Sequence, residues 1–114
     1  MAIRTEKIDD VVVVLPEGMF QGGRETDELQ RQLRRQIQAN QKKILIDMRE
    51  TKALSSVPIG VLVGVHTSAT NRGLHLYMCN IERRIDNTLA ILKLINVFNV
   101  FDTREQALEA FKKV

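Results

Sequence analysis

Short runs of apolar residues recur along the chain, and polar segments separate them. Residues 11–15 (VVVVL) and 44–48 (ILIDM) are almost continuously apolar, which is typical of strands buried on both faces. Residues 74–79 (LHLYMC) alternate well enough to form another strand, and residues 97–101 form a last apolar run. Residues 3–7 fit a short edge strand. The pattern therefore predicts four to five strands.

Helical periodicity fills the segment between the first two buried strands. Residues 16–18 (PEG) should end the first of these strands, and Gly22 and Gly23 should form a flexible loop. Thr26 is the expected N-cap of the helix that follows, which frays around Asn40. Its apolar positions recur every four residues and form one narrow stripe, so we expect a surface helix that lies on a sheet. The stripe consists of Leu29, Leu33 and Ile37.

A second, unusually apolar helix is expected from Val57 to about Thr70. Residues 49–52 read as a polar connection that leads to it. Residues 71–73 (NRG) should end this helix with the glycine in the left-handed conformation. Small residues spaced four apart, which are Gly60, Gly64 and Ser68, should give the helix one face suited to close packing.

Two shorter helices complete the pattern. Residues 85–95 carry an amphipathic repeat, which consists of Ile85, Leu89 and Leu92. Thr103 and Gln106 fit a capping box at the start of the final helix. That helix should point Ala107, Leu108 and Phe111 inward.

The alternation of strands and helices with short links predicts an α/β fold. We expect one domain over residues 1–114, in which about four helices cover a mixed, mostly parallel sheet of four to five strands. In such sheets functional groups gather beyond the carboxyl ends of the strands. The adjacent residues Ser55 and Ser56 follow one of those ends.

Composition narrows the class of protein only slightly. The net charge of +3 would suit nucleic acid or an acidic protein partner. Basic residues cluster between Arg24 and Lys43, but no aromatic side chains are interleaved for base stacking, so we expect no nucleic-acid partner. The single cysteine, Cys79, excludes an intramolecular disulfide and favours a reducing, cytoplasmic location. No secretory signal is expected, and the longest apolar run is too short to insert into a membrane.

Residues capable of catalysis are scattered. His66 and His75 have neither a metal-binding nor a triad spacing, and Cys79 reads as an apolar strand residue. Asp47 ends a strand, where it is either a catalytic carboxylate or, more commonly, an acceptor for nearby loop amides. No phosphate loop, dinucleotide fingerprint or nucleophile elbow is present in the sequence. We therefore expect no enzyme activity, no metal and no cofactor.

Two interpretations fit Ser55 and Ser56. A serine before Val57 and Pro58 is an expected N-cap, which contributes about 1 kcal/mol. The alternative is a phosphoacceptor, because a phosphate of about −1.5 to −2 charges is tolerated at a helix N-terminus. A partner docked over the turn would then meet a bulky, hydrated dianion.

The whole chain resembles the STAS domain of anti-sigma factor antagonists, also called anti-anti-sigma factors. The resemblance lies in residues 44–47 (ILID) followed by 54–64 (LSSVPIGVLVG), which are similar to the family pattern of a strand with a terminal Asp and a Ser-rich turn. Gly22 and Gly23, residues 71–73, residues 89–101 and residues 102–108 are similar to it too. Ser55 stands where the family has an acidic or amide residue, and Pro58 where it usually has Gly.

The resemblance implies a bacterial regulator of transcription that binds an anti-sigma factor serine kinase and thereby releases a sigma factor. Phosphorylation of the motif serine, Ser56, would reverse this, with Ser55 as a substitute acceptor. The expected partner-binding residues are Gly22, Gly23, Thr51, Ser55, Ser56, Val57, Pro58 and Ile59. The protein would be a monomer or a weak dimer. The alternative is a STAS subunit without a switch, which braces a lipid-transport ATPase or a stress-sensing assembly; a small-molecule-binding STAS domain is a third option.

Overall fold

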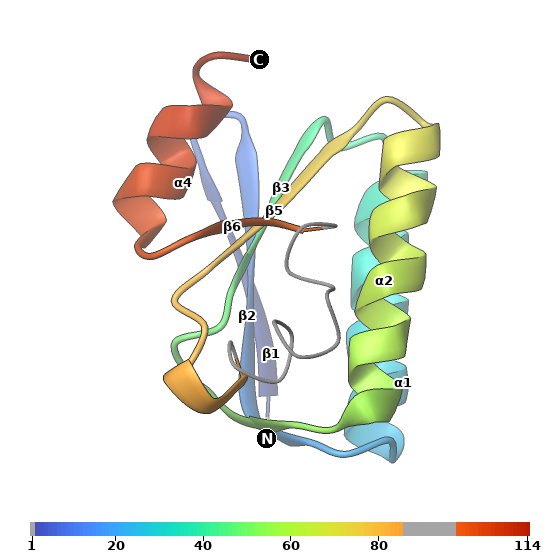
Figure 1. Ribbon diagram of the computed structural model, residues 1–114. Coiled ribbons are helices and arrows are strands. Elements are labelled where there is room, and N and C mark those ends of the chain that lie inside the picture. Colours follow the sequence, from blue (N-terminus) through green and yellow to red (C-terminus); the bar gives the residue numbers. More distant parts are fainter. Residues whose placement is uncertain (1, 86–97) are drawn as a thin grey trace.

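The computed structural model describes residues 2–85 and 98–114 (Figure 1). The described elements are β1 (Ala2–Ile8), β2 (Val11–Phe20), α1 (Arg24–Gln38), β3 (Lys43–Asp47), β4 (Thr51–Leu54), α2 (Ser56–Asn71), β5 (His75–Cys79), β6 (Asn99–Phe101) and α4 (Arg104–Phe111). The strands form one mixed sheet in the order β1-β2-β3-β5-β6, and β4 pairs with β2. The predicted α/β class with a mostly parallel sheet is confirmed, because β1 alone of the described strands runs antiparallel to its neighbour.

Strand β2 is longer than its sequence indicates. Its β-branched first half pairs in parallel with β3, from Val11 to Val14. The prediction that residues 16–18 end the strand is wrong, since β2 continues to Phe20. Gly18 has φ +110°, and the register shifts between Gly18 and Met19. This bulge lets the strand continue and pair with β4.

Strand β4 replaces the polar connection that was expected up to Lys52. Thr51 is 1% exposed, and its hydroxyl donates to the carbonyl oxygen of Pro16 at 2.9 Å. The Gly18 amide donates to the carbonyl oxygen of Glu50 at 3.0 Å. These long-range bonds make residues 51–54 a strand and bring the described sheet to six strands, one more than the upper end of the prediction.

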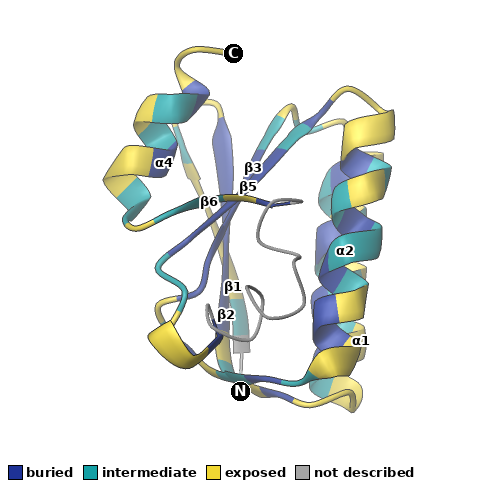
Figure 2. Ribbon diagram, viewed as in Figure 1, coloured by how far each residue is buried: buried dark blue, intermediate teal, exposed yellow. Residues whose placement is uncertain are grey.

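Helices cover both faces of the sheet (Figures 1 and 2). Helices α1 and α2 lie side by side on one face, where the predicted stripe on α1 is buried together with Leu62 and Val65 of α2. Helix α4 covers the opposite face, where Ala107 and Phe111 are buried and Leu108 is half-buried. The Phe111 ring stacks on Tyr77 with a centroid distance of 4.2 Å. The expected helix over residues 85–95 lies almost wholly outside the described residues.

The helix ends are set by different groups. Helix α1 has Gly23 as its N-cap, so the prediction of Thr26 as the cap is wrong. Thr26 lies inside the first turn, is buried, and accepts a hydrogen bond from the Gly22 amide at 2.9 Å. At α4 one half of the predicted capping box is confirmed, because the backbone N–H of Gln106 donates to Thr103 Oγ1 at 3.1 Å. The other half differs, since the Gln106 side chain accepts from the backbone N–H of Asp102 at 3.1 Å and not from that of Thr103. Gly73 has φ +72°, as its predicted role after α2 requires.

Candidate functional site

Two loops meet at one end of the sheet. Strands β2 and β4 are parallel neighbours with Phe20 opposite Leu54, so the loops that follow them leave the sheet side by side. The Ser55 amide donates to the carbonyl oxygen of Phe20 at 3.0 Å and fixes this arrangement. The loop of residues 21–23 therefore lies next to the turn of residues 55–57, which starts α2. We call these six residues together the two-loop surface.

Gly22 and Val57 are the contact point of this surface. Gly22 has φ +98°, and a Cβ built on it would lie 3.2 Å from Val57 Cβ. Only glycine fits both the backbone conformation and the space without strain. Val57 is nonetheless 56% exposed, and it is one of three large apolar residues that are exposed in the described part of the chain. The contact therefore presents an apolar group to the outside.

The two serines have different environments. Ser55 is the N-cap of α2 by position, but its side chain makes no capping hydrogen bond. Its Oγ atom is buried and has no hydrogen-bond partner among the described residues. Pro58 gives part of the reason, because it holds the third helical position and has no N–H, which removes one of the two amides that an N-cap side chain uses. Ser56, the first residue of α2, is exposed.

The expected partner-binding residues divide into two groups. Gly22, Gly23, Ser56 and Val57 are exposed, and Ser55 is half-buried, so these five come together at the surface. The other three residues are buried beneath the surface of the turn, and they are Thr51, Pro58 and Ile59. Their side chains are not available to a partner in this structure.

Two exposed residues next to the two-loop surface escaped the sequence analysis. Met19 is 50% exposed, and Arg84 donates to the carbonyl oxygen of Lys52 at 2.9 Å. Both line a shallow depression of about 370 Å³ whose other lining residues are Gln21, Ala53, Leu54, Ser55 and Ile85. Met19 could have been found only by recognising that β2 extends past Pro16. The position of Arg84 could not be predicted from its neighbours in the sequence, because its hydrogen-bond acceptor on β4 is 32 residues away.

Asp47 belongs to a buried polar network instead of the two-loop surface. Its carboxylate is 0% exposed. It accepts hydrogen bonds from Arg104 Nε at 2.9 Å, Asn80 Nδ2 at 3.0 Å and the Arg49 amide at 3.2 Å. The Arg49 amide fits the predicted role of Asp47 as an acceptor for nearby loop amides, whereas the other two donors are side chains from distant parts of the sequence.

The remaining candidates for chemistry are the buried thiol of Cys79 and the imidazole of His66. Burial raises the pKa of the Cys79 thiol to about 12, so Cys79 stays protonated and unreactive at neutral pH. His66 packs edge-on against Phe98, and burial lowers the pKa of its imidazole. Within residues 2–85 and 98–114, no three His, Cys, Asp or Glu side chains form a group that could hold a metal ion. No helix in the described part of the chain is long and apolar enough to cross a membrane.

The mixed sheet, the covering helices and the serine turn at the start of α2 define a STAS domain. The family model for the STAS domain matches residues 2–107, and the chain therefore belongs to this family. The chain is 21% identical over 112 residues to BtrV of Bordetella bronchiseptica, a candidate anti-sigma factor antagonist, and the match covers 98% of this chain and 96% of BtrV.

Solved structures have the same fold. A candidate anti-sigma factor antagonist from Thermotoga maritima superimposes with a TM-score of 0.87 at 17% identity, covering 95% of this chain and 92% of that chain. The anti-sigma factor antagonist SpoIIAA in its unphosphorylated form gives a TM-score of 0.78 at 13% identity, covering 99% and 100%. The phosphorylated form of SpoIIAA from Bacillus gives 0.74 at 13% identity, covering 96% and 99%.

Proposed function

We propose that this protein is an anti-sigma factor antagonist that acts by binding and not by catalysis. Its two-loop surface would capture an anti-sigma factor that is also a serine kinase, and this capture would release a sigma factor. The observation that carries the proposal is the exposed hydroxyl residue Ser56, which lies at the start of α2 beside the exposed Val57 and the Gly22 loop.

Ser56 is a better phosphoacceptor than Ser55. A kinase needs the hydroxyl oxygen in its active site, and the Oγ atom of Ser55 is buried. Ser56 follows it directly and is exposed. We therefore assign the proposed modification to Ser56, and a phosphate on Ser55 would first require the turn to open.

A phosphate on Ser56 would change binding more than folding. The first turn of α2 contains no acidic residue, and its free amides and dipole favour an anion. The same dianion would lie beside Val57, and a partner that buries this apolar side chain would have to desolvate the phosphate. The domain would stay folded while its affinity for the partner falls.

The experiment begins with the tagged chain, which captures its partner from a lysate of the native cell. Titration calorimetry on the purified partner then compares the parent chain with Ser56→Ala and Ser56→Glu. We expect Ser56→Ala to bind like the parent and Ser56→Glu to bind at least about tenfold more weakly, because a charge beside a desolvated contact costs more than about 1.4 kcal/mol. Thr70→Glu is the matched control, since it adds the same charge at an exposed site near the opposite end of α2.

Incubation of the complex with ATP tests the kinase half of the proposal. Mass spectrometry should find one phosphate, on Ser56, in the parent chain and none in Ser56→Ala. Equal binding of Ser56→Glu and the parent would overturn the switch. Capture of a transporter ATPase without phosphate incorporation would instead support the accessory-subunit alternative.

A further inference from the structure

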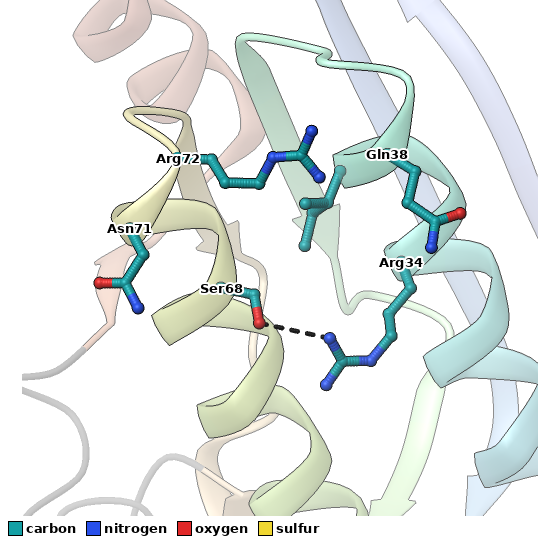
Figure 3. Close-up of a pocket in the computed structure, with 6 residues that line it drawn as sticks. Arg34, Gln38, Ser68, Asn71 and Arg72 are labelled. Atoms are coloured by element: carbon teal, nitrogen blue, oxygen red, sulfur yellow. Dashed lines mark hydrogen bonds between the residues drawn. The ribbon is translucent and has the colours of Figure 1, made fainter.

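A polar groove lies between the last turns of α1 and α2 (Figure 3). The two-loop surface lies at the other end of these helices, where they begin. It has a volume of about 310 Å³. Arg34 enters it from α1, and Arg72 reaches it from the residue that ends α2. Its remaining lining residues are Ile37, Gln38, Ser68 and Asn71.

Small residues on α2 leave room for the Arg34 side chain beside this helix. The expected small face of Gly60, Gly64 and Ser68 packs against another element only in part. Gly64 and Ser68 lie against Arg34 of α1, whereas a Cβ on Gly60 would meet no atom of the described residues within 4 Å. A Cβ on Gly64 would lie 3.9 Å from Arg34 Nη2, so the guanidinium occupies the space beside this glycine. Arg34 then reaches Ser68, where Nη1 donates to Oγ at 3.2 Å (Figure 3).

The two guanidinium groups have neutral acceptors. Arg34 bonds the hydroxyl of Ser68, and Arg72 Nη2 donates to Asn40 Oδ1 at 3.2 Å. Neither arginine takes part in an ion pair with a carboxylate among the described residues, whereas Arg31 on the same helix pairs with Glu28. Each guanidinium has five N–H donors, so the hydrogen bonds above leave most of them unused.

The negative ends of the two helix dipoles disfavour an anion in the groove, but their charge is smaller than the positive charge of the two arginines. Both helices end at the groove, and each C-terminus carries the equivalent of about −0.5 charge. Two guanidinium groups carry two full positive charges. Some of the last carbonyl oxygens also accept backbone amides, as Arg35 does from Ala39 and Ala69 from Arg72 and Leu74. The net local charge is therefore positive.

We propose that this groove binds the phosphate group of a small soluble molecule, either inorganic phosphate or a phosphate monoester. A phosphate offers several acceptor oxygens, which suits planar N–H forks that come from two helices and a hydroxyl between them. Ile37 lies at the groove and lowers the local polarity, which strengthens the charge interaction. Among residues 2–85 and 98–114, no aromatic side chain lines the groove, so these residues offer nothing for a nucleobase to stack on.

The test is a titration of the ¹⁵N-labelled chain with inorganic phosphate and separately with glycerol phosphate, against sodium chloride of equal ionic strength. We expect saturable shifts of the Gly64, Ser68 and Asn71 amides with phosphate and not with chloride. Arg34→Gln and Arg72→Gln should each weaken binding about tenfold, since each removes a charge-assisted bond. Arg31→Gln, on α1 but paired with Glu28, should change it less than about twofold.

Several outcomes would overturn the proposal. Linear shifts that chloride reproduces would show general screening. Equal affinities for the parent, Arg34→Gln and Arg72→Gln would place the anion elsewhere. Binding to phosphatidylcholine vesicles that contain phosphatidic acid, without binding to soluble phosphate, would point to a lipid surface instead. Circular dichroism checks that both variants are folded; if Arg34→Gln is not, the exposed Arg72 decides the test.

Discussion

Arg104 donates from Nε to the carboxylate of Asp47 at 2.9 Å, although the two residues are 57 positions apart. Asp47 ends β3 and is fully buried, while Arg104 is the first residue of α4. The same guanidinium reaches Glu6 on β1 from Nη1 at 2.6 Å. One side chain thus connects the last helix to two strands of the sheet. Arg104 is also the closer of the two cations that pair with the buried carboxylate, since Arg49 Nε lies 4.0 Å from Asp47 Oδ2.

Arg104→Ala should destabilise the domain by about 3 kcal/mol, because it removes the closer of the two cations that pair with a buried carboxylate. The measurement is urea unfolding followed by circular dichroism. Arg4→Ala is the matched control: Arg4 pairs with Glu17 at 3.8 Å in an exposed site, so its loss should cost less than about 1 kcal/mol. Similar losses in the free energy of unfolding for both variants would mean that the buried ion pair of Asp47 contributes no more to stability than an exposed one.

Ser55→Ala should leave the stability unchanged or raise it by up to about 1 kcal/mol, which is the reverse of the usual effect at an N-cap. The hydroxyl is buried without a hydrogen-bond partner among the described residues, so its removal relieves a desolvation cost. Thr103→Ala is the comparison, because Thr103 does accept the Gln106 amide, and its loss should cost about 1 kcal/mol. Thermal unfolding of the two variants measures the contrast. A clear loss of stability in Ser55→Ala would show that the hydroxyl finds a partner in solution.

The regular elements could be predicted because their signals are local. Each of these signals involves only residues close together in the sequence. The examples are the β-branched runs that start at Val11 and Ile44 and the four-residue repeat from Leu29 to Ile37. The capping pair of Thr103 and Gln106 is likewise contained in four residues. Segments with such local patterns form the predicted secondary structure in the folded domain, and the order of these segments along the chain gives the α/β class.

The candidate site depended on contacts that no local pattern contains. Thr51 looks like a polar linker residue until Pro16, 35 positions away, supplies the acceptor for its hydroxyl. Thr26 looks like an N-cap in the sequence, but Gly23 is the N-cap of α1. Thr26 is buried in the first turn, where its hydroxyl accepts a hydrogen bond from the Gly22 amide. The serine turn itself was located correctly, whereas the exposure of its members follows from the pairing of β2 with β4.

Cys79 should stay unreactive toward a thiol reagent at pH 8 in the native protein and react fully in guanidinium chloride. Burial raises its pKa from 9.0 to about 12, so the thiolate is absent from the folded state. The unfolded chain loses this proton near pH 9 and the folded chain near pH 12, so the group makes stability fall as pH rises between these values. Urea midpoints at increasing pH should fall less steeply for Cys79→Ala than for the parent. Equal slopes, or rapid native labelling at pH 8, would contradict the prediction.

Gly22→Ala should both destabilise the domain and disturb the two-loop surface. Its φ of +98° is unfavourable for any residue with a Cβ, and that atom would lie 3.2 Å from Val57 Cβ, so Val57 must move. We expect a loss of about 1–2 kcal/mol in urea unfolding. Gly60→Ala is the matched control, since a Cβ on this exposed helical glycine would meet no atom of the described residues within 4 Å. This change should raise the free energy of unfolding by about 0.5–1 kcal/mol. If the proposed partner docks on Val57, Gly22→Ala should also weaken capture at a temperature where the variant is fully folded, and Gly60→Ala should weaken it less. Unchanged capture by folded Gly22→Ala would remove Val57 from the proposed contact.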